Sequence, residues 1–194
     1  MREEEILRQD KFLAKRDVWA IGGTFRIMTP EGKLLLYSRQ KLFRLKEDIR
    51  VYADLERKRE VLHIQARQII DFAAAYDVID SLTREKIGVL RRRGFSSIFR
   101  DKWEILTSDE SYLAKIEEDS LFKATIRRWV FNLIPQTYYI VDSRERRLAE
   151  IKQFFNPFIH KFFVDFSLDK EKVLDKRLGL AGVILLLAIE GRQR

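Results

Sequence analysis

A run of twelve residues near the C-terminus, from Leu178 to Ile189, would be apolar on every face of a helix. Because a helix without a polar face must be surrounded by apolar groups, its environment is either lipid or a protein core. At about 1.5 Å per residue the run spans about 18 Å, against about 30 Å for the hydrocarbon core of a bilayer. Arg177 and Glu190 flank it directly, so a membrane span would draw charge into hydrocarbon. The run therefore predicts a helix buried inside a protein.

This helix is expected to cover about residues 168–190. Ser167 or Asp169 can cap its start, and Gly191 stands where a left-handed C-cap glycine is expected. The charged stretch that precedes the apolar run would then form the first turns of the same helix.

Upstream of the helix, short apolar runs alternate with polar turns. Three pairs of runs have the pattern of β-hairpins, at residues 24–37, 76–90 and 138–151, and the last two continue alike, as a divergent repeat of about sixty residues. The other expected strands are residues 49–52, 61–66, 103–106, 113–117 and 162–166. About eleven or twelve such strands favour a closed antiparallel barrel or a sandwich, and a barrel of more than eight strands can hold a helix. We therefore expect a mainly β fold, a closed antiparallel barrel of about 12 strands around the C-terminal helix, with Gly179 and Gly182 letting a strand approach that helix.

The chain has 194 residues, which is typical of one domain. We expect residues 1–18 to form an N-terminal arm or short helix, and residues 19–194 to form the barrel domain. Residues 121–133, stopped by Pro135, have the pattern of an amphipathic helix. Such a helix would either plug one end of the barrel or lie at a membrane interface, with Phe131 among cations.

Several classes of function lack their sequence signatures. The chain has no cysteine and only two histidines, His63 and His160, far apart in sequence, which argues against thiolate and histidine metal sites. No G-x-S-x-G, P-loop or Gly-rich dinucleotide turn is present, so we expect neither an enzyme nor a cofactor. The acidic N-terminus is unlike a secretory signal, so we expect a cytoplasmic protein, with peripheral attachment to the inner face of the membrane as a further option.

Two clusters of basic residues are candidate anion-binding groups in a chain of net charge +8. The first follows a strand and contains two phenylalanines: Arg91, Arg92, Arg93, Phe95, Phe99, Arg100 and Lys102. The second sits in a hairpin turn: Arg144, Arg146 and Arg147. A basic loop with exposed aromatics can bind headgroup phosphates, and the two clusters form one patch if they share an end of the barrel. Alternatively, the arginines point to solvent while the phenylalanines join the core.

Five features together carry a family resemblance over roughly residues 20–191. They are residues 40–52, residues 66–78, the hairpins with an aspartate before the turn, residues 174–181 and residues 190–193. In this order, together with the terminal apolar helix, they resemble the phospholipid scramblases, the LURP-one-related proteins and the Tubby C-terminal domain. The resemblance implies a β-barrel threaded by the C-terminal helix and work at lipid surfaces, namely phosphoinositide binding or calcium-stimulated lipid movement.

A scramblase mechanism would need an acidic calcium segment before the last helix. Asp165, Asp169 and Asp175 are the weak candidates for such a metal site. Their spacing is not that of an EF-hand loop, and interleaved lysines oppose cation binding, so capping and surface pairing explain them better. The absence of cysteine also removes a palmitoyl anchor.

We therefore expect a non-enzymatic scramblase-like or Tubby-like domain that binds anionic phospholipid at a membrane surface through a basic patch. The alternative is a cytosolic protein-interaction scaffold. Nucleic acid is the competing polyanion, but no recognition helix, zinc module or RNA-binding signature is present, so we do not expect it as a partner.

Overall fold

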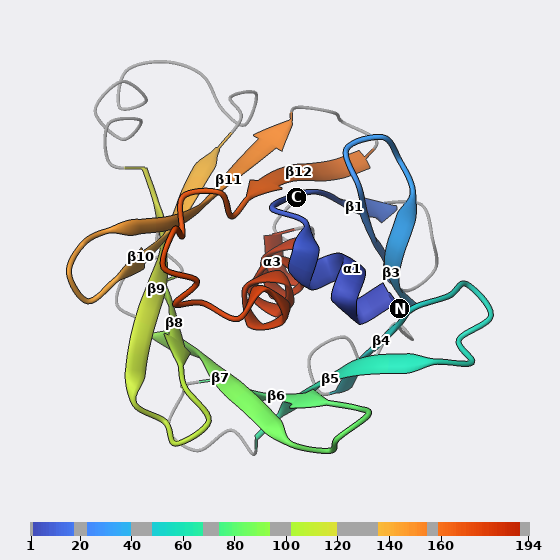
Figure 1. Ribbon diagram of the computed structural model, residues 1–194, viewed down its shortest axis with the longest axis horizontal. Helices are drawn as coiled ribbons and strands as arrows, with labels where there is room; N and C mark the ends of the chain where they lie inside the picture. Colours follow the sequence, from blue (N-terminus) through green and yellow to red (C-terminus); the bar gives the residue numbers. More distant parts are fainter. Residues whose placement is uncertain are drawn as a thin grey trace.

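The computed structural model describes residues 2–17, 23–39, 48–67, 74–93, 102–119, 136–154 and 159–190. In these residues, antiparallel strands close into a barrel around helix α3 (Lys176–Glu190), and helix α1 (Arg2–Arg8) crosses one end of it (Figure 1). The mainly β fold and the closed 12-strand antiparallel barrel expected from the sequence are confirmed. The amphipathic helix expected at residues 121–133 lies outside the described residues.

Each strand pairs with its neighbours in the chain, and β1 pairs with β12 to close the barrel. The strands are β1 (Lys11–Asp17), β2 (Thr24–Met28), β3 (Leu34–Arg39), β4 (Asp48–Tyr52), β5 (Glu60–Ala66), β6 (Ala75–Asp80), β7 (Lys86–Arg93), β8 (Lys102–Leu106), β9 (Tyr112–Glu118), β10 (Thr137–Asp142), β11 (Arg147–Phe154) and β12 (Ile159–Asp165). Because successive strands alternate in direction, the turns after the even-numbered strands all lie at one end of the barrel. Helix α3 begins at that end, which we call the turn end, and the opposite end is the far end.

The boundary expected between the N-terminal arm and the barrel is corrected by strand β1. This strand lies between β12 and β2, so the barrel begins at Lys11 and not at residue 19. Phe12, Ala14 and Arg16 alternate toward the interior and are buried. The inward arginine interrupts the apolar alternation, which is why the strand was not expected.

The start of the C-terminal helix is also corrected, to Lys176 from about residue 168. The Asp169 carboxylate accepts the backbone N–H groups of Val173 and Leu174, at 3.0 and 2.8 Å, and so closes a tight loop ahead of the helix. Lys172 in this loop has a left-handed backbone, with φ of 53°, which a helix cannot contain. Asp175 takes the capping role, accepting the Arg177 N–H at 2.8 Å.

The core is formed by α3 and the inward side chains of the strands. From Leu178 to Ala188 the apolar side chains of α3 are at most 4% exposed, so the apolar run is buried in protein as expected. A Cβ atom on Gly182 would lie 2.9 Å from the Ile116 side chain of β9, which is the close approach expected there. On Gly179 it would instead meet the ring of Phe166, at 2.6 Å.

Candidate functional site

The turns at the turn end share one construction. In four of them an aspartate accepts backbone N–H groups, and a residue three or four positions later has a left-handed backbone. These pairs are Asp54 with Arg57, Asp80 with Arg84, Asp142 with Glu145, and Asp169 with Lys172. Side-chain acceptors of this kind stabilise tight turns, so the turn end presents its exposed side chains from fixed backbone positions.

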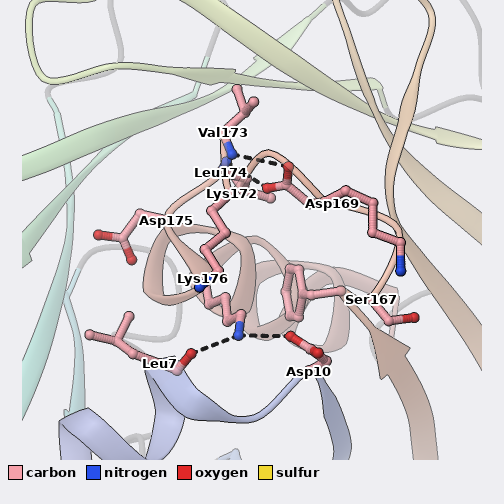
Figure 2. Close-up of a pocket in the computed structure, with 11 residues that line it drawn as sticks. Leu7, Asp10, Ser167, Asp169, Lys172, Val173, Leu174, Asp175 and Lys176 are labelled. Atoms are coloured by element: carbon pink, nitrogen blue, oxygen red, sulfur yellow. Dashed lines mark hydrogen bonds and ion pairs between the residues drawn. The ribbon is translucent and has the colours of Figure 1, made fainter.

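A hollow of about 600 Å³ lies at the turn end, between α1 and the segment that leads into α3 (Figure 2). Leu7, Phe166, Val173 and Leu174 supply its apolar lining. A second hollow of about 500 Å³ shares four residues with it: Leu7, Asp10, Lys172 and Lys176. We call the two together the α1 groove. Each of the two hollows is within the range of about 300–1,000 Å³ typical of ligand pockets.

Lys176 fixes the wall of the α1 groove. Its Nζ donates to the carbonyl oxygen of Leu7, at 2.7 Å, and lies 2.9 Å from a carboxylate oxygen of Asp10 (Figure 2). It also donates to the carbonyl oxygen of Gln9, at 2.7 Å. A lysine at the last carbonyls of a helix is a favourable cap. Ile6, on the inner side of α1, is fully buried in the core. These contacts attach α1 to the start of α3.

Most acidic groups of the α1 groove already have partners within the protein. Asp169 receives two backbone N–H groups, and Asp175 lies 2.8 Å from Arg177. Asp10 is paired with Lys176, as described above. Of the acidic side chains that line the groove, Glu4 alone has no partner among the described residues.

Cations and apolar side chains remain exposed around the groove. Three basic side chains make no ion pair with any described residue: Arg8, Lys170 and Lys172. Three apolar side chains beside them are exposed: Leu7, Leu168 and Val173. We call these six residues the turn-end surface. It combines a net positive charge with exposed apolar groups.

The two basic clusters predicted from the sequence do not form one patch. Arg91 and Arg92 lie in the last part of β7, near the far end, whereas Arg144 and Arg146 lie in the β10–β11 turn, at the turn end. The condition for a joint patch is therefore not met. Arg93 ends β7 and Lys102 begins β8, both at the far end of the barrel. The side chains of these two residues, and the whole of Arg100, lie outside the part of the chain that the structure describes.

Several of these arginines already have partners. Arg91 Nη2 lies 2.7 Å from the buried carboxylate of Glu104. Arg146 bridges Asp142 and Glu171, at 2.8 and 2.7 Å. The remaining pair of the second cluster differs: Arg147 stacks on the Tyr139 ring and Arg144 has an exposed side chain. Only part of the predicted charge is therefore available to a ligand.

The weak calcium candidates are not gathered into one site. Asp165 accepts the N–H of Ser167 and lies 3.7 Å from Lys11 Nζ, while Asp169 and Asp175 are occupied as described above. Among the described residues, no three carboxylate, histidine or cysteine side chains are grouped closely enough to hold a metal ion. Burial alone would raise the pKa of Asp165, but the hydrogen bonds from Ser167 and the charge of Lys11 lower it overall.

The α1 groove was missed in the sequence because its parts are far apart in the chain. Lys170 and Lys172 were interpreted only as a reason against calcium binding. Leu7 and Val173 were interpreted as parts of helices, and only the position of α1 over the start of α3 brings them together. The available signal was a short charged stretch with two lysines, flanked by Leu168 and Val173. None of the described helices is long and apolar enough to span a membrane.

The comparisons with known proteins agree with this architecture. The family model described as LURP-one-related matches residues 34–186. A solved X-ray structure of a protein from Arabidopsis thaliana is similar, with a TM-score of 0.52, 12% sequence identity, and coverage of 93% of this chain and 92% of that chain. At this identity the likeness concerns the fold alone. A comparison with curated proteins gives no match.

Proposed function

Because the chain belongs to the LURP-one-related family, within the Tubby-like superfamily, we propose that it is a non-enzymatic domain that binds anionic phospholipid at a membrane surface. The turn-end surface would face the bilayer. In a cell such a domain would attach peripherally, at the inner face of a membrane. The basic residues near the far end are the competing contact.

The observation that carries the proposal is the composition of the turn-end surface. Arg8, Lys170 and Lys172 have no described ion-pair partner, and the exposed Leu7, Leu168 and Val173 lie among them. Each basic residue near an anionic leaflet contributes about 1 kcal/mol, and apolar side chains add affinity when they enter the interface. Three cations and three apolar side chains would give a weak, reversible association.

The outer wall of the barrel supports the same orientation, since its charges are largely paired with one another. Lys115 lies 3.3 Å from Glu117, and Lys152 lies 2.9 Å from Glu150. Charges neutralised in this way contribute little long-range attraction to a polyanion. The attraction would then come from the unpaired cations at the ends of the barrel.

Vesicle co-sedimentation tests the proposal. Neutral phosphatidylcholine vesicles are compared with vesicles containing phosphatidylserine or phosphoinositide, each at low and high salt. We expect binding to the anionic vesicles only, weakened by salt. A turn-end variant, R8Q/K170Q/K172G, should bind at least tenfold more weakly; glycine suits position 172 because its backbone is left-handed.

The matched control is K15Q/R39Q/K161Q, which removes the same number of charges near the far end, at side chains that make no ion pair with any described residue. It should bind anionic vesicles within twofold of the unaltered protein. Normal binding by the turn-end variant with loss in the control would assign the contact to the far end instead. Binding to no vesicle would exclude the lipid proposal and leave the protein-interaction scaffold.

A further inference from the structure

We propose that the α1 groove takes up one apolar chain of an anionic amphiphile, with the phosphate or carboxylate head of that molecule against Lys170 and Lys172. This inference rests on the proposed function, because it adds a ligand class to the same end of the barrel. It differs from surface attachment in requiring a cavity that accepts a chain.

The shape and lining of the groove support a chain-bearing ligand. The hollow of about 600 Å³ is large enough for a ligand and continues into the hollow of about 500 Å³ along α1. Its apolar lining comes from separate elements, Leu7 on α1, Phe166 after β12, and Val173 and Leu174 before α3. An apolar chain placed there would remove these side chains from water.

The charges on its rim determine which head the amphiphile would carry. Asp169 and Asp175 already accept hydrogen bonds from the protein, and Asp10 is paired with Lys176. Lys170 and Lys172 line the same hollow with no described ion-pair partner. The rim therefore has cationic groups available, which favours an anionic head over a zwitterionic one.

The groove is built on a fixed support. Three hydrogen-bonding contacts of Lys176 attach α1 to the start of α3, and Glu5 is paired with Lys33 of the β2–β3 turn at 2.5 Å. A pocket whose walls are held in this way loses little conformational entropy when a ligand binds.

Isothermal titration calorimetry with monomeric lysophosphatidic acid, below its micelle concentration, tests the inference. Lysophosphatidylcholine carries the same chain with a zwitterionic head, and glycerol 3-phosphate carries the head without the chain. A fatty acid with the same chain distinguishes a carboxylate from a phosphate source. We expect lysophosphatidic acid to bind at least tenfold more tightly than lysophosphatidylcholine or glycerol 3-phosphate.

Two variants separate the groove from general surface charge. L7Q/V173T makes the lining polar without changing the net charge, and it should weaken lysophosphatidic acid at least tenfold. Because Leu7 and Val173 also belong to the turn-end surface, it should weaken vesicle binding too, whereas L168Q, outside the groove lining, should weaken vesicle binding alone. K172G should weaken both kinds of binding. R57G is its matched control, because Arg57 is an exposed cation with the same left-handed backbone in a turn outside the groove.

The outcomes distinguish this inference from the proposed function. Vesicle binding without binding of monomeric lysophosphatidic acid would overturn the groove proposal and leave surface attachment intact. Equal affinity of L7Q/V173T and the unaltered protein for lysophosphatidic acid would overturn it as well. Binding of the monomer without binding of any vesicle would support the groove and contradict the proposed membrane attachment.

Discussion

The Arg16 guanidinium lies inside the barrel and donates to the carbonyl oxygen of Leu187, 2.9 Å away, at the end of the central helix. These residues are 171 positions apart, on the first strand and on the last helix. The last carbonyl groups of a helix have no partner within the helix, and here Leu187 and Ala188 are buried. Arg16 therefore satisfies the polar end of a helix that is otherwise apolar.

Replacement of Arg16 by methionine should destabilise the fold. The change keeps an unbranched side chain but leaves a buried carbonyl without its donor, and a lost hydrogen bond to a charged group costs about 1.5–3 kcal/mol. The free energy of unfolding in urea would measure it. Lys15→Met, on the neighbouring half-buried position, is the control and should change stability by less than about 1 kcal/mol. Equal effects of the two changes would contradict the capping role.

Substitution of Gly88 by alanine should be more harmful than substitution of Gly182. A Cβ on Gly88 would lie 2.6 Å from the backbone oxygen of Leu106 and 2.6 Å from the Leu178 side chain, so β7 would have to move. Such overpacking costs about 1–3 kcal/mol. On Gly182 the nearest atom is the end of the Ile116 side chain, at 2.9 Å, and alanine also favours the helix by about 1 kcal/mol. Thermal unfolding of both variants should rank them in this order, and the reverse order would contradict the packing described.

The ion pair between Arg177 and Asp80 should stabilise the attachment of α3 to the barrel. Arg177 Nη1 lies 2.6 Å from Asp80 Oδ2, and Asp80 is 5% exposed. Arg177 keeps Asp175 as a second partner, so Asp80→Ala removes one charged hydrogen bond and should lose about 1.5–3 kcal/mol in urea unfolding. The exposed pair of Lys58 and Glu56 supplies the control, since Glu56→Gln should lose less than about 1 kcal/mol. A loss below about 1 kcal/mol for Asp80→Ala would show that this ion pair contributes little to the attachment of α3.

Glu110 should remain ionised in acid. Hydrogen bonds from Arg67, at 2.6 Å, and from Lys86, at 3.2 Å, lower its pKa from 4.5 to about 2. Because the folded pKa is the lower one, the pair contributes stability above about pH 4.5, and that stability is lost as the pH falls toward 2. Carboxyl ¹³C titration by NMR would measure the midpoint, and Arg67→Gln should return it toward 4.5. A midpoint near 4.5 in the unaltered protein would contradict the pairing.

Much of the fold could be predicted because the sequence patterns are local. The apolar run of α3 and the alternating strands follow directly from burial, and the aspartates before the turns mark the hairpins. Strand β1 escaped prediction because Arg16 points inward, and that orientation makes sense only once α3 ends beside it. The start of α3 was misplaced because Asp169 closes a loop, a role that resembles a helix cap in sequence.

The candidate site was less predictable, because it depends on which charges are already paired. Arg91 and Arg146 belong to the densest basic segments, yet both have carboxylate partners that lie 13 and 25 residues away in the chain. Lys170 and Lys172 belong to a mixed segment that looks neutral, until its acidic residues are seen to bind backbone groups and arginines. Pairing across the fold, and not local charge density, decides which cations remain available.

The most direct test of the account is which end of the barrel faces the membrane. The chain has no cysteine, so a single Leu168→Cys or Phe154→Cys variant can carry one environment-sensitive fluorophore. The side chains at the two positions are almost equally exposed, 44% for Leu168 and 45% for Phe154. Leu168 lies at the turn end of the barrel, whereas Phe154 is the last residue of β11, at the far end. With phosphatidylserine vesicles, we expect a blue shift in emission for the label at position 168 and none for the label at position 154. A shift at position 154 alone, or at neither position while the protein sediments with vesicles, would contradict it.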